Sequence, residues 1–137
     1  MNIADLVPHA GAMVLLDRVE AWDAAGILCR ACSHLDPANP LRHGGRLAAC
    51  CGLEWALQAA ALHGALRAGG VAQRAGYVAA LRAVQLHVDR LDVIAYGDLR
   101  VIARLDREEE GGIIYTLAVE AADLTPLVSG RAVISLP

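Results

Sequence analysis

The sequence lacks the features that would connect it with nucleic acids, membranes or secretion. Its 137 residues include 12 Lys+Arg and 15 Asp+Glu, for a formal net charge of -3, and its basic residues are scattered rather than clustered as nucleic-acid binding requires. The longest apolar run is interrupted by Glu54, Gln58 and His63, which argues against a membrane span. The first residues contain no basic region and no long apolar stretch, so we expect no secretory signal and a cytoplasmic location.

The sequence also lacks a pattern typical of metal or nucleotide binding. Cys29 and Cys32 have C-x-x-C spacing, but the segment alternates like a strand, so the two thiols would point to opposite faces, and no second ligand pair follows. We therefore predict no metal and no cofactor. We expect both thiols to be small buried packing residues. Packing is also the favoured role for Cys50 and Cys51, although a thiol near a helix N-terminus can have a lowered pKa.

Apolar residues, in contrast, are abundant. They make up 56% of the chain, and the mean hydropathy is +0.42. For a chain of single-domain size, this composition indicates either a large core or apolar surface that contacts a partner subunit. We predict one domain over residues 1–137, with no repeat and no linker.

Hydrophobic periodicity predicts one long helix among several strands. Residues 47–68 are almost wholly apolar, and a helix that is apolar on every side is typically buried. The strand candidates are residues 13–22, 27–35, 75–88, 93–106, 113–122 and 127–136. A curved antiparallel sheet wrapped around the helix would cover it, so we predict the α+β hotdog fold, and a dimer that protects the sheet edges.

One acid, Glu54, lies within the apolar helix, and we expect its neighbours to bury it. Because burying an unpaired charge is costly, this carboxylate must be paired, neutralised or used. The irregular segment before the helix, residues 36–46, contains His43 followed by two glycines. A helical acid beside a loop histidine predicts an acid/base pair.

Several segments together resemble one enzyme family over nearly the whole chain. Residues 6–22 (LVPHAGAMVLLDRVEAW) resemble the opening segment of the FabA/FabZ-type 3-hydroxyacyl-(acyl carrier protein) dehydratases. Residues 52–64 (GLEWALQAAALHG) are similar to the family's central helix, in which glutamine follows an acid by four residues, and residues 75–105 resemble the next two strands. The divergent branch found as an accessory dehydratase in aryl-polyene biosynthesis looks most similar.

The chain also departs from the family pattern. The family's Met-Pro-Gly element before the helix is replaced by GGRLAACCG, and the chain contains no phenylalanine. His43 lies eleven residues before Glu54, a shorter spacing than the family has. Contact between the two, within one chain or across a dimer interface, is what the resemblance implies.

The resemblance implies a role for each candidate site residue. Glu54 would protonate the departing hydroxyl, His43 would be the base, and a backbone N–H at the helix N-terminus would stabilise charge on the thioester oxygen. The candidates for close backbone approach to the substrate are Gly44, Gly45 and Gly52. Gln58 lies one turn beyond Glu54, where it can hydrogen-bond the acid or a loop carbonyl and so support substrate binding. For His9, a structural role is favoured over catalysis.

The predicted function is removal of water from 3-hydroxyacyl thioesters on acyl carrier protein, giving 2-enoyl thioesters. The partners implied are acyl carrier protein with its phosphopantetheine-linked acyl chain, and a second hotdog subunit in a homodimer or a heterodimer. Two alternatives stay open: a non-catalytic partner subunit of an active hotdog dehydratase, and an acyl thioesterase. A basic patch for the acidic carrier protein would draw on Arg42, Arg46, Arg74 and Arg82.

Overall fold

The computed structural model describes residues 1–74 and 76–137. Its elements are α1 (Gly52–Arg67) and the strands β1 (Arg18–Asp23), β2 (Gly26–Ala31), β3 (Tyr77–Leu86), β4 (Leu99–Glu109), β5 (Gly112–Glu120) and β6 (Pro126–Ser135). The strands form one sheet in the order β1-β2-β4-β5-β6-β3, with every neighbouring pair antiparallel. Across this described part of the chain, no helix is both long and apolar enough to cross a membrane.

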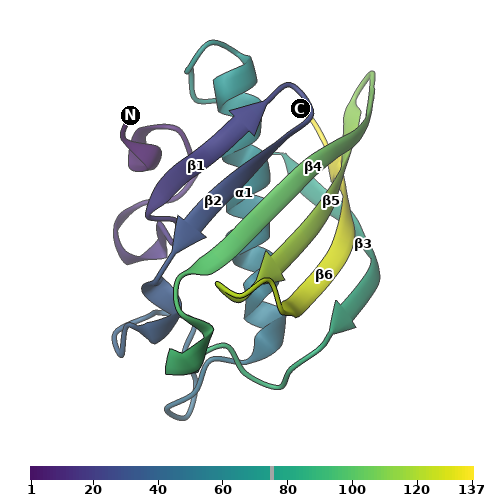
Figure 1. Cartoon of the computed structure of the whole chain (residues 1–137). Helices are drawn as coiled ribbons and strands as arrows, with labels where there is room; N and C mark the ends of the chain where they lie inside the picture. The colour runs from purple at the N-terminus through teal and green to yellow at the C-terminus, as the bar shows by residue number, and fades with distance from the viewer. Residues whose placement is uncertain (75) are drawn as a thin grey trace.

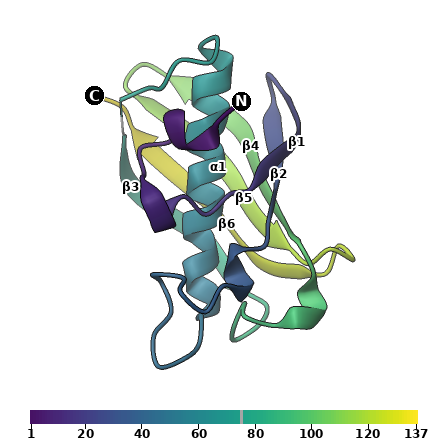
Figure 2. The same cartoon turned by 90° about the vertical axis from the view of Figure 1, so that its left-hand side faces the viewer.

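The sheet curves around the single long helix. Figure 1 shows α1 behind the sheet, and Figure 2 shows it running along one sheet face while the N-terminal segment crosses its other side. The helix contacts β2, β4, β5 and β6. This is the hotdog arrangement, and the predicted fold is confirmed. The predicted dimer stays a prediction.

Alternation along the strands separates the two faces of the sheet. In β5 every second side chain is buried toward the helix, namely Ile113, Tyr115, Leu117 and Val119. The outer face carries ion pairs, since Arg100 Nε lies 3.0 Å from Glu120 Oε1 and Arg30 Nη1 lies 3.8 Å from Glu20 Oε1. A period of two thus places the core inside and the charges outside.

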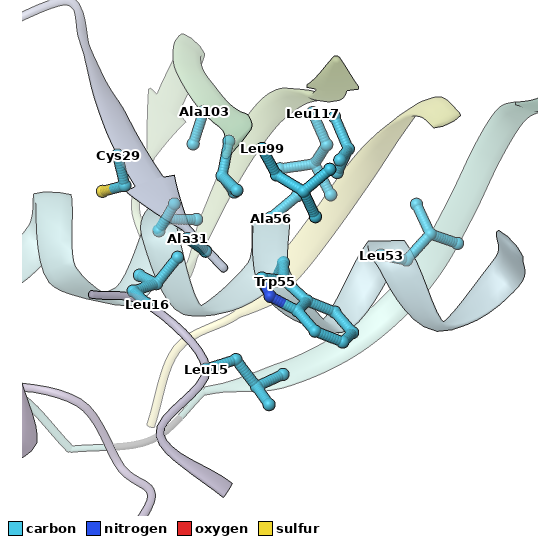
Figure 3. Close-up of a cluster of buried hydrophobic side chains, with 14 of the residues drawn as sticks. Leu15, Leu16, Cys29, Ala31, Leu53, Trp55, Ala56, Leu99, Ala103 and Leu117 are labelled. Carbon is cyan, nitrogen blue, oxygen red and sulfur yellow. The ribbon is translucent and has the colours of Figure 1, made fainter. Parts of the chain in front are cut away.

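The N-terminal segment covers part of the helix that the sheet does not reach. Figure 3 shows the Trp55 ring directed toward Leu15, while Ala56 faces Leu99 on the sheet side. Trp55 Nε1 donates a hydrogen bond to Ser33 Oγ at 3.0 Å, and this hydroxyl donates to the carbonyl oxygen of Leu15 at 2.6 Å. The buried indole is therefore satisfied by a chain of hydrogen bonds that also fixes the segment before β1.

The helix begins at Gly52 rather than at residue 47, after a 3-10 turn at Ala49–Cys51. The preceding residues pair with a distant loop, because Leu91 donates its N–H to the Leu47 carbonyl at 2.9 Å and Ala49 donates to the Asp89 carbonyl at 3.0 Å. These tertiary hydrogen bonds hold the backbone extended and outweigh local helix propensity.

Three strands have an end that lies four or more residues inside the predicted bounds. β1 begins at Arg18 rather than at residue 13, because the backbone groups of Met13 and Leu15 bond to the Gln58 side chain. Residues 33–35 form a 3-10 turn, and β4 begins only at Leu99, after a 3-10 turn at Ile94–Tyr96 and Gly97 with φ +63°. The predicted strand start at Ala75 lies outside the described residues.

β3 is an edge strand whose side chains are mostly exposed. Five of its apolar residues are at least two-fifths exposed: Tyr77, Val78, Leu81, Val84 and Leu86. Apolar side chains are therefore exposed along one edge of the sheet, and in the described residues no strand pairs with the outer side of β3.

Two of the four cysteines differ from the expectation of buried packing. Cys29 is buried, and its burial raises the pKa of the thiol to about 12. Cys32 and Cys50 are exposed, so the packing role predicted for them is wrong. Burial raises the pKa of the half-buried Cys51 thiol above its ordinary value, which disfavours a reactive thiolate there.

Candidate active site

One side of α1 faces an open cleft of about 800 Å³. The half-buried residues Glu54, Leu57, Ala61 and Gly64 recur at helical spacing and all line this cleft. The composition of the helix predicted that it is covered on every side, but one side faces this cleft and is not covered. The uncovered stripe is the one that carries the acid.

Glu54 pairs with His9 at one end of this cleft. His9 Nε2 lies 2.7 Å from Glu54 Oε1, and the two side chains are 25% and 31% exposed. Glu54 is thus less buried than predicted, and its partner comes from the N-terminal segment. The other ring nitrogen of His9, Nδ1, is buried with no hydrogen-bond partner among the described residues. Because each group can give or take a proton, this contact forms an acid/base pair open to a ligand.

Gln58 holds the segment that carries His9. Its Oε1 accepts a hydrogen bond from the Leu15 N–H at 2.9 Å, and its Nε2 donates to the Met13 carbonyl at 2.6 Å. The side chain is fully buried. The loop carbonyl that the sequence suggested as its partner is therefore found, and it belongs to Met13. Gln58 fixes the backbone that follows His9, while its role in substrate binding stays a prediction.

The structure does not bring His43 and Glu54 together in the described part of the chain. His43 is exposed, and its N–H donates to the Arg46 carbonyl at 2.9 Å. Gly44 and Gly45 between them have φ of +59° and +76°, which a tight turn of this kind requires. The glycines thus build a surface turn. The catalytic role of His43 and the substrate contacts of Gly44 and Gly45 stay predictions.

Gly52 faces the sheet. A Cβ there would lie 3.0 Å from a Val128 methyl carbon and 3.2 Å from one of Leu91. Its N–H already donates to the carbonyl groups of Ala49 and Cys50. The glycine is therefore explained by close helix–sheet packing, and the substrate contact predicted for it stays a prediction.

Arg42 is occupied by structural contacts. It donates to the carbonyl oxygens of Asp36 and His34 and lies 3.3 Å from Asp92 Oδ2. Hydrogen bonds from Arg90 hold the pKa of the Asp92 carboxyl well below its ordinary value. This cluster ties the loop before α1 to the loop before β4, so Arg42 is poorly placed to serve a carrier protein.

Sequence reasoning missed the position of His9. The signal was present, because Pro8 and His9 belong to the opening segment that resembles the dehydratases. Its contact with a helix residue 45 positions later could not be read from spacing. Both His9 and Glu54 line the cleft with Pro8 and Leu6. The opening segment and the central helix, each of which is a weak family signal by itself, therefore meet at one site.

Comparison with solved structures supports the fold. A chain of the dehydratase heterocomplex ApeI:P from Xenorhabdus doucetiae matches with a TM-score of 0.83 at 19% identity, over 100% of this chain and 91% of that one. AziG of S. sahachiroi matches with a TM-score of 0.62 at 13% identity, over 90% and 92% of the two chains. The E. coli PaaI protein, from the phenylacetic acid degradation operon, gives 0.59 at 13% identity, over 85% and 80%.

A comparison with curated proteins finds no match. A protein-family model described as ApeP-like, ApeP dehydratase, matches residues 1–135. This match includes both the opening segment with His9 and the helix with Glu54. It agrees with the resemblance to the aryl-polyene branch of dehydratases seen in the sequence. The chain belongs to the ApeP-like dehydratase family.

Proposed function

We propose that this chain removes water from 3-hydroxyacyl thioesters carried by acyl carrier protein, with His9 and Glu54 as its acid/base pair. The observation that carries the proposal is the 2.7 Å contact between His9 Nε2 and Glu54 Oε1 at the wall of a largely apolar cleft. Two proton-exchanging groups in contact within a concave site are typical of acid/base catalysis. The base assigned here is His9 rather than His43.

The pair can complete an elimination without net proton exchange with solvent. Neutral His9 takes the proton from C2 beside the thioester carbonyl, the bond between C3 and the hydroxyl oxygen breaks, and protonated Glu54 gives its proton to the departing hydroxyl. The products are the 2-enoyl thioester and water, with His9 as imidazolium and Glu54 as carboxylate. A proton passing from His9 to Glu54 across their 2.7 Å contact restores the starting forms.

The test supplies a 3-hydroxyacyl thioester of acyl carrier protein to the purified chain, alone and with a paralogous hotdog subunit, and measures the enoyl product. Glu54→Gln and His9→Gln should each lower turnover by about 10²- to 10⁴-fold, the usual contribution of a positioned acid or base. Wild-type turnover in both variants would refute the assignment.

His43→Gln is the matched control, because His43 is exposed and has no contact with Glu54 in the described residues. We expect wild-type turnover from it. A loss in His43→Gln with none in His9→Gln would return the base role to His43, acting from another chain. Release of free thiol in the same assay would indicate a thioesterase instead.

A second candidate function is that of a non-catalytic partner subunit. The related ApeI:P structure is a heterocomplex, and the apolar, unpaired edge of β3 in this chain suits pairing with another hotdog sheet. In this case the chain would shape the acyl cleft of an active paralogue in the cytoplasm. Glu54→Gln in this chain would then leave turnover by the mixed complex unchanged.

A further inference from the structure

The free edge of β3 (Figure 1) exposes apolar side chains on the side of the sheet that faces the helix. Leu81 is in register with buried Ala132 of β6, and a Cβ on buried Gly130 would lie 3.3 Å from Val84 Cγ2. Four β3 residues on this side are 41–50% exposed: Val78, Leu81, Val84 and Leu86. An added strand with apolar side chains on the same side would cover them.

The outer side of the same edge is positively charged. Arg82 is exposed and is the only charged residue of β3, and it lies directly opposite Arg131 of β6. Arg131 Nη2 lies 3.2 Å from Asp106 Oδ2, whereas Arg82 forms no ion pair with any described residue. Like charges directly opposite each other on neighbouring strands are destabilising. This edge therefore carries one cation that the acid beside it does not neutralise.

A second copy of this chain offers no acid to this cation. No Asp or Glu occurs between Glu54 and Asp89, so β3 contains none in any register. Antiparallel pairing of two β3 strands would place Arg82 opposite a neutral side chain or a second Arg82. The apolar side of a second copy would match as well as that of any other partner. Charge on the outer side therefore distinguishes a second copy from a different subunit.

We infer that the β3 edge selects, over a second copy of this chain, a partner subunit whose edge strand is apolar on the helix-facing side and carries an Asp or Glu opposite Arg82 on the outer side. That carboxylate would pair with Arg82 and reduce its repulsion from Arg131. This inference rests on the second candidate function, because it states the chemistry of the partner subunit. Arg82 determines the choice of partner and takes no part in the elimination.

The experiment measures two dissociation constants by analytical ultracentrifugation without substrate, one for self-association and one for a paralogous hotdog subunit. The wild-type chain should bind the paralogous subunit more tightly than it binds itself. Arg82→Gln removes one attractive cross-strand pair and should weaken binding of the paralogous subunit about two- to fivefold. Arg82→Glu replaces attraction by repulsion and should weaken it about four- to twenty-fivefold, without weakening self-association.

Arg104→Glu is the matched control. Arg104 is exposed on β4 in the same outer row, since it lies opposite Thr116, which lies opposite Arg131. It is three strands from β3, about 14 Å, which is beyond the screening length of about 10 Å at 0.1 M salt. We expect both dissociation constants to stay at the wild-type values. At about 0.5 M salt the difference between wild type and Arg82→Glu should shrink, because exposed charges are then screened.

Three results would overturn the inference: self-association as tight as binding of the paralogous subunit, no binding of that subunit, or the same binding in Arg82→Glu as in the wild type. A difference that persists unchanged at high salt would also overturn it, because packing rather than charge would then be responsible. Turnover is assayed separately. Charge-dependent pairing together with loss of turnover in Glu54→Gln would reject only the non-catalytic role of this chain and leave the choice of partner supported.

Discussion

Replacing Gln58 with leucine removes the link between α1 and the segment that carries His9. The two side chains have similar volume, so the main loss is of two hydrogen bonds, from the Leu15 N–H at 2.9 Å and to the Met13 carbonyl at 2.6 Å. Leu15 is 1% exposed, so its N–H would be left buried without a partner, at a cost of about 1–3 kcal/mol. Met13 is half-buried, and water can reach its carbonyl more readily.

The expected loss is about 2–3 kcal/mol of unfolding free energy, after allowing for the favourable burial of the leucine side chain. For a chain of this length the melting temperature should fall by roughly 6–12 °C. Urea unfolding measures the change as a lower midpoint with an unchanged slope. Turnover measured well below the melting temperature should also fall, because His9 would no longer be held against Glu54.

Gln73→Leu provides the matched control for stability, since Gln73 is exposed and its side chain donates to the nearby Val71 carbonyl. This variant should change the unfolding free energy by less than about 0.5 kcal/mol. If Gln58→Leu were equally neutral and kept full turnover, the reasoning that Gln58 positions the N-terminal segment would be refuted.

Two further predictions concern a buried histidine and a cleft glycine. Burial lowers the pKa of His34, which is fully buried, so below about pH 6.5 the unfolded chain binds a proton that the folded chain does not. The unfolding free energy should therefore fall as the pH drops below this value, by up to about 1.4 kcal/mol per pH unit. Urea midpoints measured between pH 5 and 7.5 should depend less on pH in His34→Leu than in the wild type. The same pH dependence in both proteins would contradict this prediction. A Cβ on helical Gly64 meets no atom of the described residues within 4 Å, so Gly64→Ala should stabilise the chain by about 0.5–1 kcal/mol. The control Gly52→Ala should destabilise it, because its Cβ would lie 3.0 Å from Val128, and thermal unfolding distinguishes the two.

The fold could be predicted because hydrophobic period is a local signal. The alternation in β5 and the apolar run of α1 can be read within a few residues, and they lead to one helix inside an antiparallel sheet. The predicted element boundaries were wrong where hydrogen bonds to distant residues determine them. The start of α1 moved to Gly52 because Leu47 and Ala49 bond to the loop before β4, which no window of sequence around them reveals.

The same limit explains why His43 was favoured over His9. His43 is close to Glu54 in sequence and is flanked by glycines, but those glycines form its own surface turn. His9 reaches Glu54 because the intervening chain folds back over α1, and this return depends on Gln58 and Ser33, whose side chains bond to the backbone of Met13 and Leu15. The sequence therefore singled out Glu54, and only the tertiary structure shows that His9 is the side chain in contact with it.

The glutamine that follows Glu54 by four residues connects the two motifs on which the family resemblance rested. Glu54 faces the cleft, whereas Gln58 is buried beneath the N-terminal segment. One turn of helix thus presents the carboxylate and also holds the backbone that delivers His9 to it. Under the proposed function, this arrangement couples stability to turnover. A substitution at Gln58 should therefore reduce turnover even though both proton-exchanging groups remain in the chain.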